Sequence, residues 1–276
     1  MWSKDNYTIF MFTLRLGKQG IPLWFRTFEG TNDPDAFQNS LMLEGIKYII
    51  NLFKDKDVKL VFLADRWFYN FKILNYINKY NSFFAVRMKA NANTKIYIYD
   101  DKEKHIIRKY ASDIKPYAYH SKLFKDVYFT RRKYKYNMAI SKSHGVKEPW
   151  YIVTNMEPDR AIKDYGYRFG SIETVFKNEK TNGFYLENTR TKNLRAFQNM
   201  FAVVCIAQVW LSLLGIDYQK NRKHYQKYLH ITYNKKYKNK IVKIMSIFNL
   251  GLTIFSKIYK SCTNFVLKFN FKLYDL

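Results

Sequence analysis

The chain has 276 residues, of which 47% are hydrophobic and 19% are aromatic. This composition excludes a disordered chain, and the length allows one large domain or two small ones. The formal charge is +26 at pH 7, from 48 lysines and arginines against 22 acidic residues. Such an excess indicates a polyanionic partner, and nucleic acid is the first candidate because neutralised phosphates release counterions. A membrane surface is the second candidate, and a coding bias toward Lys, Asn, Tyr, Phe and Ile would explain the charge without a partner.

The two cysteines and the apolar segments indicate a cytoplasmic protein outside the membrane. Cys205 and Cys262 belong to no CxxC or Cys/His cluster, so neither zinc nor a disulfide framework is predicted, and Cys205 in VVCIAQVW is predicted to be buried. The N-terminus, MWSKDNYTIF, has no basic segment followed by an apolar run, so no signal peptide is predicted. Residues 201–215 are the longest apolar stretch. They include Gln208 and are short for a bilayer, which predicts a buried helix.

Residues 1–89 are predicted to form the first part of an α/β core. The runs YTIFMFTL and IPLWFRTF flank GKQG and predict a hairpin. Asp33 is a good N-cap with Pro34 at the first helical position, and the apolar residues that follow recur at helical spacing. VKLVFLAD (58–65) predicts a buried strand that ends in an acid. An amphipathic helix in RWFYNFKILNYINKY and a strand in SFFAVRMK complete the order β-β-α-β-α-β.

Residues 90–156 are predicted to be a β-rich insertion, because TKIYIYD, DVYFT, YNMAI and WYIVT are short strand-like runs between charged turns. Residues 157–216 are predicted to return to the core. Helical patterning begins at about residue 157 and continues to Lys180, and a second helix is predicted from about Lys192 to Leu214.

Residues 217–276 are predicted to form a basic helical tail, with no acidic residue between Asp217 and Asp275. Residues 220–243 contain nine lysines and arginines. Aromatic side chains are interleaved with them, among them His224, Tyr225, Tyr228, Tyr233 and Tyr237. Basic residues bind phosphate and rings stack on bases, so the segment is a candidate nucleic-acid contact. The alternative is a solvated helix face whose tyrosines touch the core.

Two carboxylates are candidate metal ligands. Asp65 follows a buried strand, and open α/β sheets bind ligands at the carboxyl ends of strands, where a carboxylate suits Mg²⁺. The alternative is that Asp65 only caps the following helix. Glu173 lies in YGYRFGSIETVFKNEK (165–180), where Lys177 and Lys180 share its helical face. The alternative for Glu173 is an ordinary i,i+4 pair with Lys177, worth roughly 0.3–0.5 kcal/mol.

Together these features resemble the DDE transposases of the insertion sequence 4 group. The second catalytic Asp of that group stands in a strand-end motif like LADRWF, which Asp65 matches. Its Glu-bearing helix carries the signature Tyr-x2-Arg-x3-Glu-x6-Lys, matched here by Tyr165, Arg168, Glu173 and Lys180. The resemblance extends to about residue 215. It implies an α/β fold with a ribonuclease-H-like catalytic core, interrupted by a β-rich insertion and followed by C-terminal helices.

The resemblance implies a DNA-binding transposase that cleaves and transfers DNA strands when an insertion sequence moves. Phosphoryl transfer in this family uses two Mg²⁺ or Mn²⁺ ions held by carboxylates, here Asp65 and Glu173. Tyr165, Arg168 and Lys180 would hold DNA phosphates. The implied partners are the DNA of transposon ends and a second copy of the chain on paired ends. Two alternatives are a non-catalytic DNA-binding remnant and a basic membrane-surface protein.

The sequence departs from the family pattern at two places. Four residues separate Arg168 from Glu173 where the family has three, which on a straight helix places them about 140° apart. A new helix that begins near Ser171, after Gly170, would let Arg168 reach round. The family's first Asp stands on the first strand of the core, and Asp5, in a polar stretch that predicts a turn, is the only acid ahead of the hairpin. We therefore expect a chain that begins part-way into a longer gene, lacks this Asp and has impaired activity.

Overall fold

The computed structural model describes most of the chain, in two compact units. The described residues are 2–4, 7–17, 19–30, 34–91, 93–100, 104–143, 148–168, 170–180, 183–226, 229–232, 234–237, 240–243 and 245–261. Met1–Thr31 and Gly170–Leu276 form one unit, here called the split unit, and Asn32–Phe169 form the central unit. This division follows spatial compactness; the boundaries at residues 89, 156 and 216 stay predictions. Asp5, Asp33, Tyr228, Tyr233 and Cys262 lie outside the described residues.

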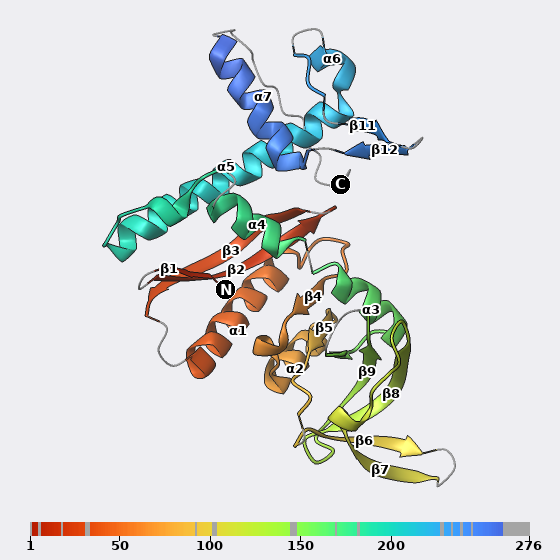
Figure 1. The fold of residues 1–276 in the computed structure, drawn as a ribbon. Helices are drawn as coiled ribbons and strands as arrows, with labels where there is room; N and C mark the ends of the chain where they lie inside the picture. Colours follow the sequence, from red (N-terminus) through yellow and green to blue (C-terminus); the bar gives the residue numbers. More distant parts are fainter. Residues whose placement is uncertain are drawn as a thin grey trace. The chain divides into compact units, whose positions relative to one another are not determined.

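The split unit begins with the predicted hairpin. Its strands are β2 (Tyr7–Leu16) and β3 (Gln19–Glu29), which pair antiparallel. A short strand that the sequence did not predict, β1 (Trp2–Lys4), pairs antiparallel with the start of β2 and completes a sheet in the order β1-β2-β3 (Figure 1). Gly17 has φ +61° in the turn, a conformation that a residue without Cβ adopts at no steric cost.

Helices cover this hairpin within the split unit. They are α4 (Ile172–Lys180), η3 (Leu186–Asn188), α5 (Leu194–Lys220), α6 (Arg222–Gln226) and α7 (Ile247–Ser261). The core forms where Tyr7 and Ile9 of β2 meet Val175 of α4 and Phe197 and Phe201 of α5. The rings of Tyr7 and Phe197 stack with centroids 4.9 Å apart. The hydrophobic face of the hairpin thus determines where α4 and α5 pack.

Helix α5 is longer than the sequence predicted, with 27 residues. By length and composition alone it is the one described helix that could cross a membrane, and 50% of its most apolar window is buried inside the protein. Within that buried half, Ser212 accepts a hydrogen bond from Gln19 Nε2 of β3 at 2.8 Å. Gln19 Oε1 in turn accepts from the backbone N–H of Phe248 at 3.1 Å. These contacts fit a core helix, as predicted for residues 201–215.

The basic tail is not one continuous helix. Between α6 and α7 lies a hairpin of β11 (Asn234–Tyr237) and β12 (Lys240–Lys243). Tyr225 is buried together with Leu214, Tyr218 and Leu250, so its ring belongs to a hydrophobic core and not to a stacking surface. For this tyrosine the alternative of a ring that touches the core is confirmed.

The central unit is built on a seven-stranded mixed sheet in the order β4-β5-β10-β9-β8-β6-β7 (Figure 1). The strands are β4 (Val61–Ala64), β5 (Phe83–Arg87), β6 (Lys95–Asp100), β7 (His105–Tyr110), β8 (Ser121–Phe129), β9 (Tyr134–Ser141) and β10 (Trp150–Thr154). The pair β4 and β5 is parallel, and every other pairing is antiparallel. The four strands predicted between residues 90 and 156 are present, and β7 was missed.

The helical elements of the central unit are α1 (Pro34–Leu52), η1 (Arg66–Phe68), α2 (Phe71–Lys79), η2 (Ala111–Asp113) and α3 (Pro158–Gly166). Pro34 opens α1 as predicted. Asn70 separates η1 from α2 and caps α2, because its side chain accepts a hydrogen bond from the N–H of Lys72 at 2.9 Å. Asn155 ties the ends of α2, β5 and β10 together, accepting from the N–H of Phe84 at 3.0 Å and donating to the carbonyl of Ser82 at 2.9 Å.

The helical run predicted from about residue 157 to Lys180 is two helices. Helix α3 ends at Gly166 and α4 begins at Ile172. Gly170 between them has φ +89°, which disfavours a continuous helix. The continuous helix was therefore wrong, whereas the new helix start predicted near Ser171 is confirmed.

Candidate active site

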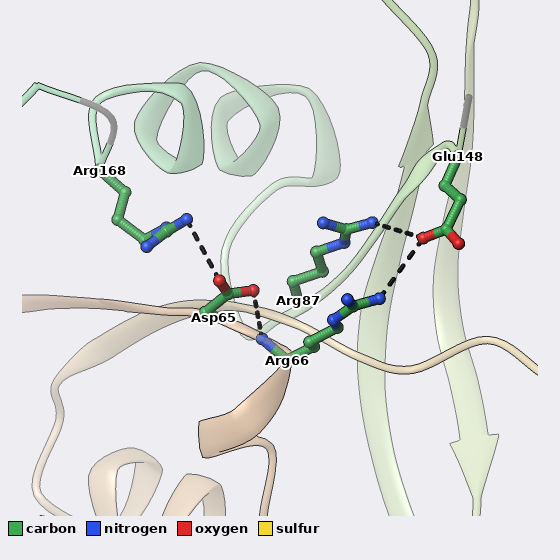
Figure 2. A network of polar contacts seen from close by, with 5 residues as sticks. All are labelled: Asp65, Arg66, Arg87, Glu148 and Arg168. Atoms are coloured by element: carbon green, nitrogen blue, oxygen red, sulfur yellow. Dashed lines mark hydrogen bonds and ion pairs between the residues drawn. The ribbon is translucent and has the colours of Figure 1, made fainter. Parts of the chain in front are cut away.

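Asp65 lies at the carboxyl end of β4, where the parallel pair β4–β5 stops. Its backbone is extended, and its Oδ1 accepts a hydrogen bond from the N–H of Arg66 at 2.6 Å (Figure 2). This contact caps η1, so the capping alternative holds for one carboxylate oxygen. The strand-end position predicted for Asp65 is also confirmed, and the two interpretations are compatible.

The second oxygen of Asp65 faces Arg168. Arg168 Nη2 lies 3.4 Å from Asp65 Oδ2, and the two side chains are 17% and 31% exposed (Figure 2). Arg168 follows the end of α3 and precedes the start of α4. It therefore does not belong to one straight helix with Glu173, which would have placed the two side chains about 140° apart. The structure thus gives Arg168 a local partner, Asp65, that the sequence did not predict.

A second ion-pair group lies beside this one. Glu148, just before β10, contacts Arg66 Nη1 at 3.4 Å and Arg87 Nη2 at 3.3 Å (Figure 2). Arg87 ends β5, and its buried Nε finds no hydrogen-bond acceptor among the described residues. Three guanidinium groups therefore stand against two carboxylates at this end of the sheet. The arrangement leaves a net positive charge and a buried N–H donor, which suit an oxyanion such as phosphate.

Sequence reasoning missed Arg87 and Glu148. They are 61 residues apart along the chain and meet only because β10 pairs with β5. The charged stretch before WYIVT was a turn signal, and it carried no information about which strand would lie beside it. For Arg66 the sequence left open a phosphate contact and a structural salt bridge, and the structure describes a salt bridge with Glu148.

Tyr165 is fully buried on α3. Its ring meets the edge of Trp150 at 5.2 Å and 72°, and the Arg168 guanidinium lies 5.6 Å from its centroid. Burial raises the pKa of the Tyr165 hydroxyl above its usual value. The predicted contact of Tyr165 with DNA phosphate stays a prediction. The structure describes a buried ring that packs against the Arg168 guanidinium.

Glu173 and Lys180 belong to α4 in the split unit. Glu173 is exposed, whereas Val175 on the other side of the helix is buried. Lys180 is half-buried in the last turn. Residues 173, 177 and 180 therefore share the outer face that their spacing predicted. The catalytic and phosphate-binding roles of this face stay predictions.

A close approach of backbone to backbone positions α4 on the hairpin. Gly20 of β3 lies so near α4 that a Cβ atom at this position would stand 2.6 Å from the carbonyl oxygen of Ser171. That oxygen accepts the first hydrogen bond of the helix, from the N–H of Val175 at 3.2 Å. Because no side chain intervenes, the first turn of α4, which carries Glu173, is held against the strand.

One buried carboxyl group on α4 escaped the sequence analysis. Glu179 has no exposed surface, and burial raises its pKa to about 8. Its Oε1 lies 3.9 Å from the thiol of Cys205, which is buried as predicted and whose pKa burial also raises. Burial thus favours the neutral form of both groups, and the pair lies in the core of the split unit.

The described residues hold no group of three His, Cys, Asp or Glu side chains that could bind a metal ion. Asp65 has hard oxygen donors and partial exposure, and Glu173 is exposed. Each fits a divalent cation by donor chemistry. A complete metal site would need further oxygen ligands, which a DNA phosphate and water can supply.

The central unit thus has a strand-end carboxylate among arginines, and the split unit has a helix that carries Glu173. The family model described as "Transposase DDE domain" matches residues 11–210. This match covers more than half of the chain, and the chain belongs to that family. No curated protein matches it. The predicted DDE transposase of a mobile element is thus confirmed, and a transposase domain implies DNA as its partner.

Proposed function

We propose that this chain carries out metal-dependent DNA cleavage and strand transfer for an insertion sequence of the insertion sequence 4 group, on a ribonuclease-H-like core. The observation that carries the proposal is the position of Asp65, at a strand end and among three arginines inside the segment that matches the family. Catalysis of phosphoryl transfer is mainly positioning and charge stabilisation, and guanidinium groups beside a carboxylate provide both.

The roles proposed for the residues follow from their surroundings. Asp65 and Glu173 would each offer carboxylate oxygens to Mg²⁺ or Mn²⁺, and such an ion would supply activation of the attacking oxygen and charge stabilisation of the leaving one. Arg168 and Arg87 hold phosphate oxygens, and Tyr165 positions Arg168. Lys180 adds a phosphate contact from α4. Since two carboxylates of the family's set of three are matched, we expect weak activity.

The test uses the purified chain and a linear DNA that carries the sequences flanking its own gene. We expect cleavage with Mg²⁺ or Mn²⁺ and none with EDTA. Asp65→Asn and Glu173→Gln should each lower the cleavage rate at least 100-fold with DNA binding intact. Asp159→Asn, an exposed carboxylate on α3, is the matched control and should cleave normally. Unchanged cleavage in both site variants would refute the assignment.

A second candidate function is DNA binding without catalysis. It is favoured by the contacts of Asp65, since one oxygen caps η1 and the other faces Arg168. DNA affinity would then fall steeply with salt while no cleavage appears with any divalent ion. Arg168→Gln separates the two candidates. The variant should bind DNA more weakly under both candidates. It should also cleave DNA more slowly than the wild type if the protein is a catalyst, whereas the non-catalytic candidate predicts no cleavage by either protein.

We further propose that the protein works in the cytoplasm, away from membranes and as a dimer on paired DNA ends. Support for the first part comes from α5, whose apolar residues Phe197 and Phe201 line a protein core. Binding to anionic vesicles without DNA binding would contradict it and favour the membrane-surface alternative. Sedimentation of the chain with and without DNA tests the dimer.

A further inference from the structure

The outer strands of the central unit carry a row of rings and cations across one face. The pairing of β7, β6, β8 and β9 places Arg108 opposite Tyr97, Tyr97 opposite Tyr128, and Tyr128 opposite Lys135. Directly opposite residues of paired strands point to the same face of a sheet. Two tyrosines therefore stand side by side with one cation at each end of the row. We call this row and its neighbours on the same face the tyrosine face.

The other side of these strands forms the core. Ile96, Val127 and Phe129, which alternate with the residues of the row, have at most 2% of their surface exposed. Tyr97 and Tyr128 are half-buried, and Arg108 and Lys135 are exposed. The core residues thus lie on the opposite side of these strands, and the half-buried rings of Tyr97 and Tyr128 keep part of their surface exposed.

Three rings of the tyrosine face, those of Tyr97, Tyr110 and Tyr128, have a cation over them. Arg132 Cζ lies 5.7 Å from the centroid of Tyr97, Lys135 Nζ lies 5.7 Å from Tyr128, and both Lys95 Nζ and Arg108 Cζ lie 6.0 Å from Tyr110. Among the described residues between 95 and 135, four such pairs therefore share one face. Proteins in general have about one significant pair per 70–80 residues.

Arg132 reaches the tyrosine face from a turn with an uncommon backbone. Thr130, Arg131 and Arg132 have φ values of +49°, +54° and +70°. Residues with a Cβ pay for this left-handed conformation, and such costs persist where the surroundings or a function hold them. The turn places the Arg132 guanidinium over Tyr97. Lys135 is paired with Asp126 at 3.1 Å, so the positive charge of the face rests on Lys95, Arg108 and Arg132.

We propose that the tyrosine face binds an unpaired DNA strand, with bases on Tyr97 and Tyr128 and phosphates on Arg108, Arg132 and Lys95. Partly exposed rings on a sheet stack on bases only when the bases are out of the duplex, whereas cations bind the phosphates of either form. The choice of DNA over RNA rests on the proposed function. The tyrosine face is separate from Asp65. Its binding of an unpaired strand is a property that the catalytic assignment does not include.

The experiment compares a fluorescein-labelled 20-nucleotide single strand with the same strand in a duplex, both bound to the full chain at 150 mM salt. We expect the double variant Tyr97→Leu/Tyr128→Leu to lose about tenfold or more in affinity for the single strand, because a base–ring stack contributes about 1–3 kcal/mol. Its affinity for the duplex should stay within about twofold. Arg108→Gln should weaken both. Tyr48→Leu, an exposed tyrosine on α1, is the control and should change neither.

Three results would overturn the proposal. The first is wild-type affinity of the double variant for the single strand, and the second is an equal loss on both DNA forms. The third is tighter, ring-dependent binding of an RNA strand of the same sequence, which would overturn the assignment to DNA. Circular dichroism melting of each variant shows whether it folds, and Arg108→Gln tests the face if the double variant does not. Failure of the proposed function looks different: Asp65→Asn then changes no cleavage, while the ring-dependent binding persists.

Discussion

The burial of Glu179 predicts a pH-dependent stability that one substitution should remove. Its carboxyl group has no exposed surface and a pKa of about 8, against 4.5 for an unperturbed group. The cause is desolvation, because burial penalises the charged form. Glu179→Gln keeps the size and shape of the side chain but carries no charge at any pH.

The sign follows from proton counting. Between pH 4.5 and about 8 the folded protein keeps a proton on Glu179 that the unfolded chain has released, so stability falls as the pH rises. The contribution is fully present below pH 4.5 and is lost by about pH 8. A pKa raised from 4.5 to about 8 corresponds to about 5 kcal/mol, which is comparable to the whole stability of a small domain.

The assay is urea unfolding of the wild type and Glu179→Gln from pH 5 to pH 9, followed by tryptophan fluorescence. The difference in unfolding free energy should grow in favour of the variant by about 4 kcal/mol between pH 5 and pH 8, and then level off. Glu173→Gln, an exposed carboxylate on the same helix, is the control and should show no such change. A difference between wild type and Glu179→Gln that does not vary with pH would refute the reasoning.

Three further predictions concern packing and burial. Gly251→Ala should destabilise the protein by about 1–3 kcal/mol in urea, because a Cβ atom would stand 1.8 Å from the Leu211 carbonyl oxygen. Alanine is the better helix former, so helix propensity alone predicts the opposite sign. An unchanged urea midpoint would disprove this close approach of α7 to α5. Cys205 should resist alkylation by iodoacetamide at pH 8 until urea unfolds the chain, since burial keeps the thiol protonated, and rapid native labelling would contradict it. Asn155→Ala should cost about 1–3 kcal/mol in urea unfolding, because it leaves the N–H of Phe84 without its acceptor and the Ser82 carbonyl without its donor; wild-type stability of the variant would count against this link.

Much of the local structure was predictable because its signals are local. Alternating apolar residues around GKQG produced the hairpin, and the combination of Gly170 with Ser171 marked the break between α3 and α4. Asp65 was placed at a strand end for the same reason, since a short apolar run that stops at an acid needs no knowledge of distant residues. The strand β7 was missed because its alternation, HIIRKY, is broken by two adjacent isoleucines.

The sequence by itself determined the family, the charge, the positions of the carboxylates and the face of α4 that carries Glu173. Only the tertiary structure decided which groups meet: Arg168 with Asp65, Arg66 and Arg87 with Glu148, and Tyr97 with Tyr128. It also decided that Glu179 is fully buried, with a raised pKa, although the next residue, Lys180, lies on the outer face of α4. The physical reason is that helix and strand periodicity and turn preferences are set by interactions among residues only a few positions apart. Strand pairing and burial instead depend on the best joint packing of segments that lie tens of residues apart.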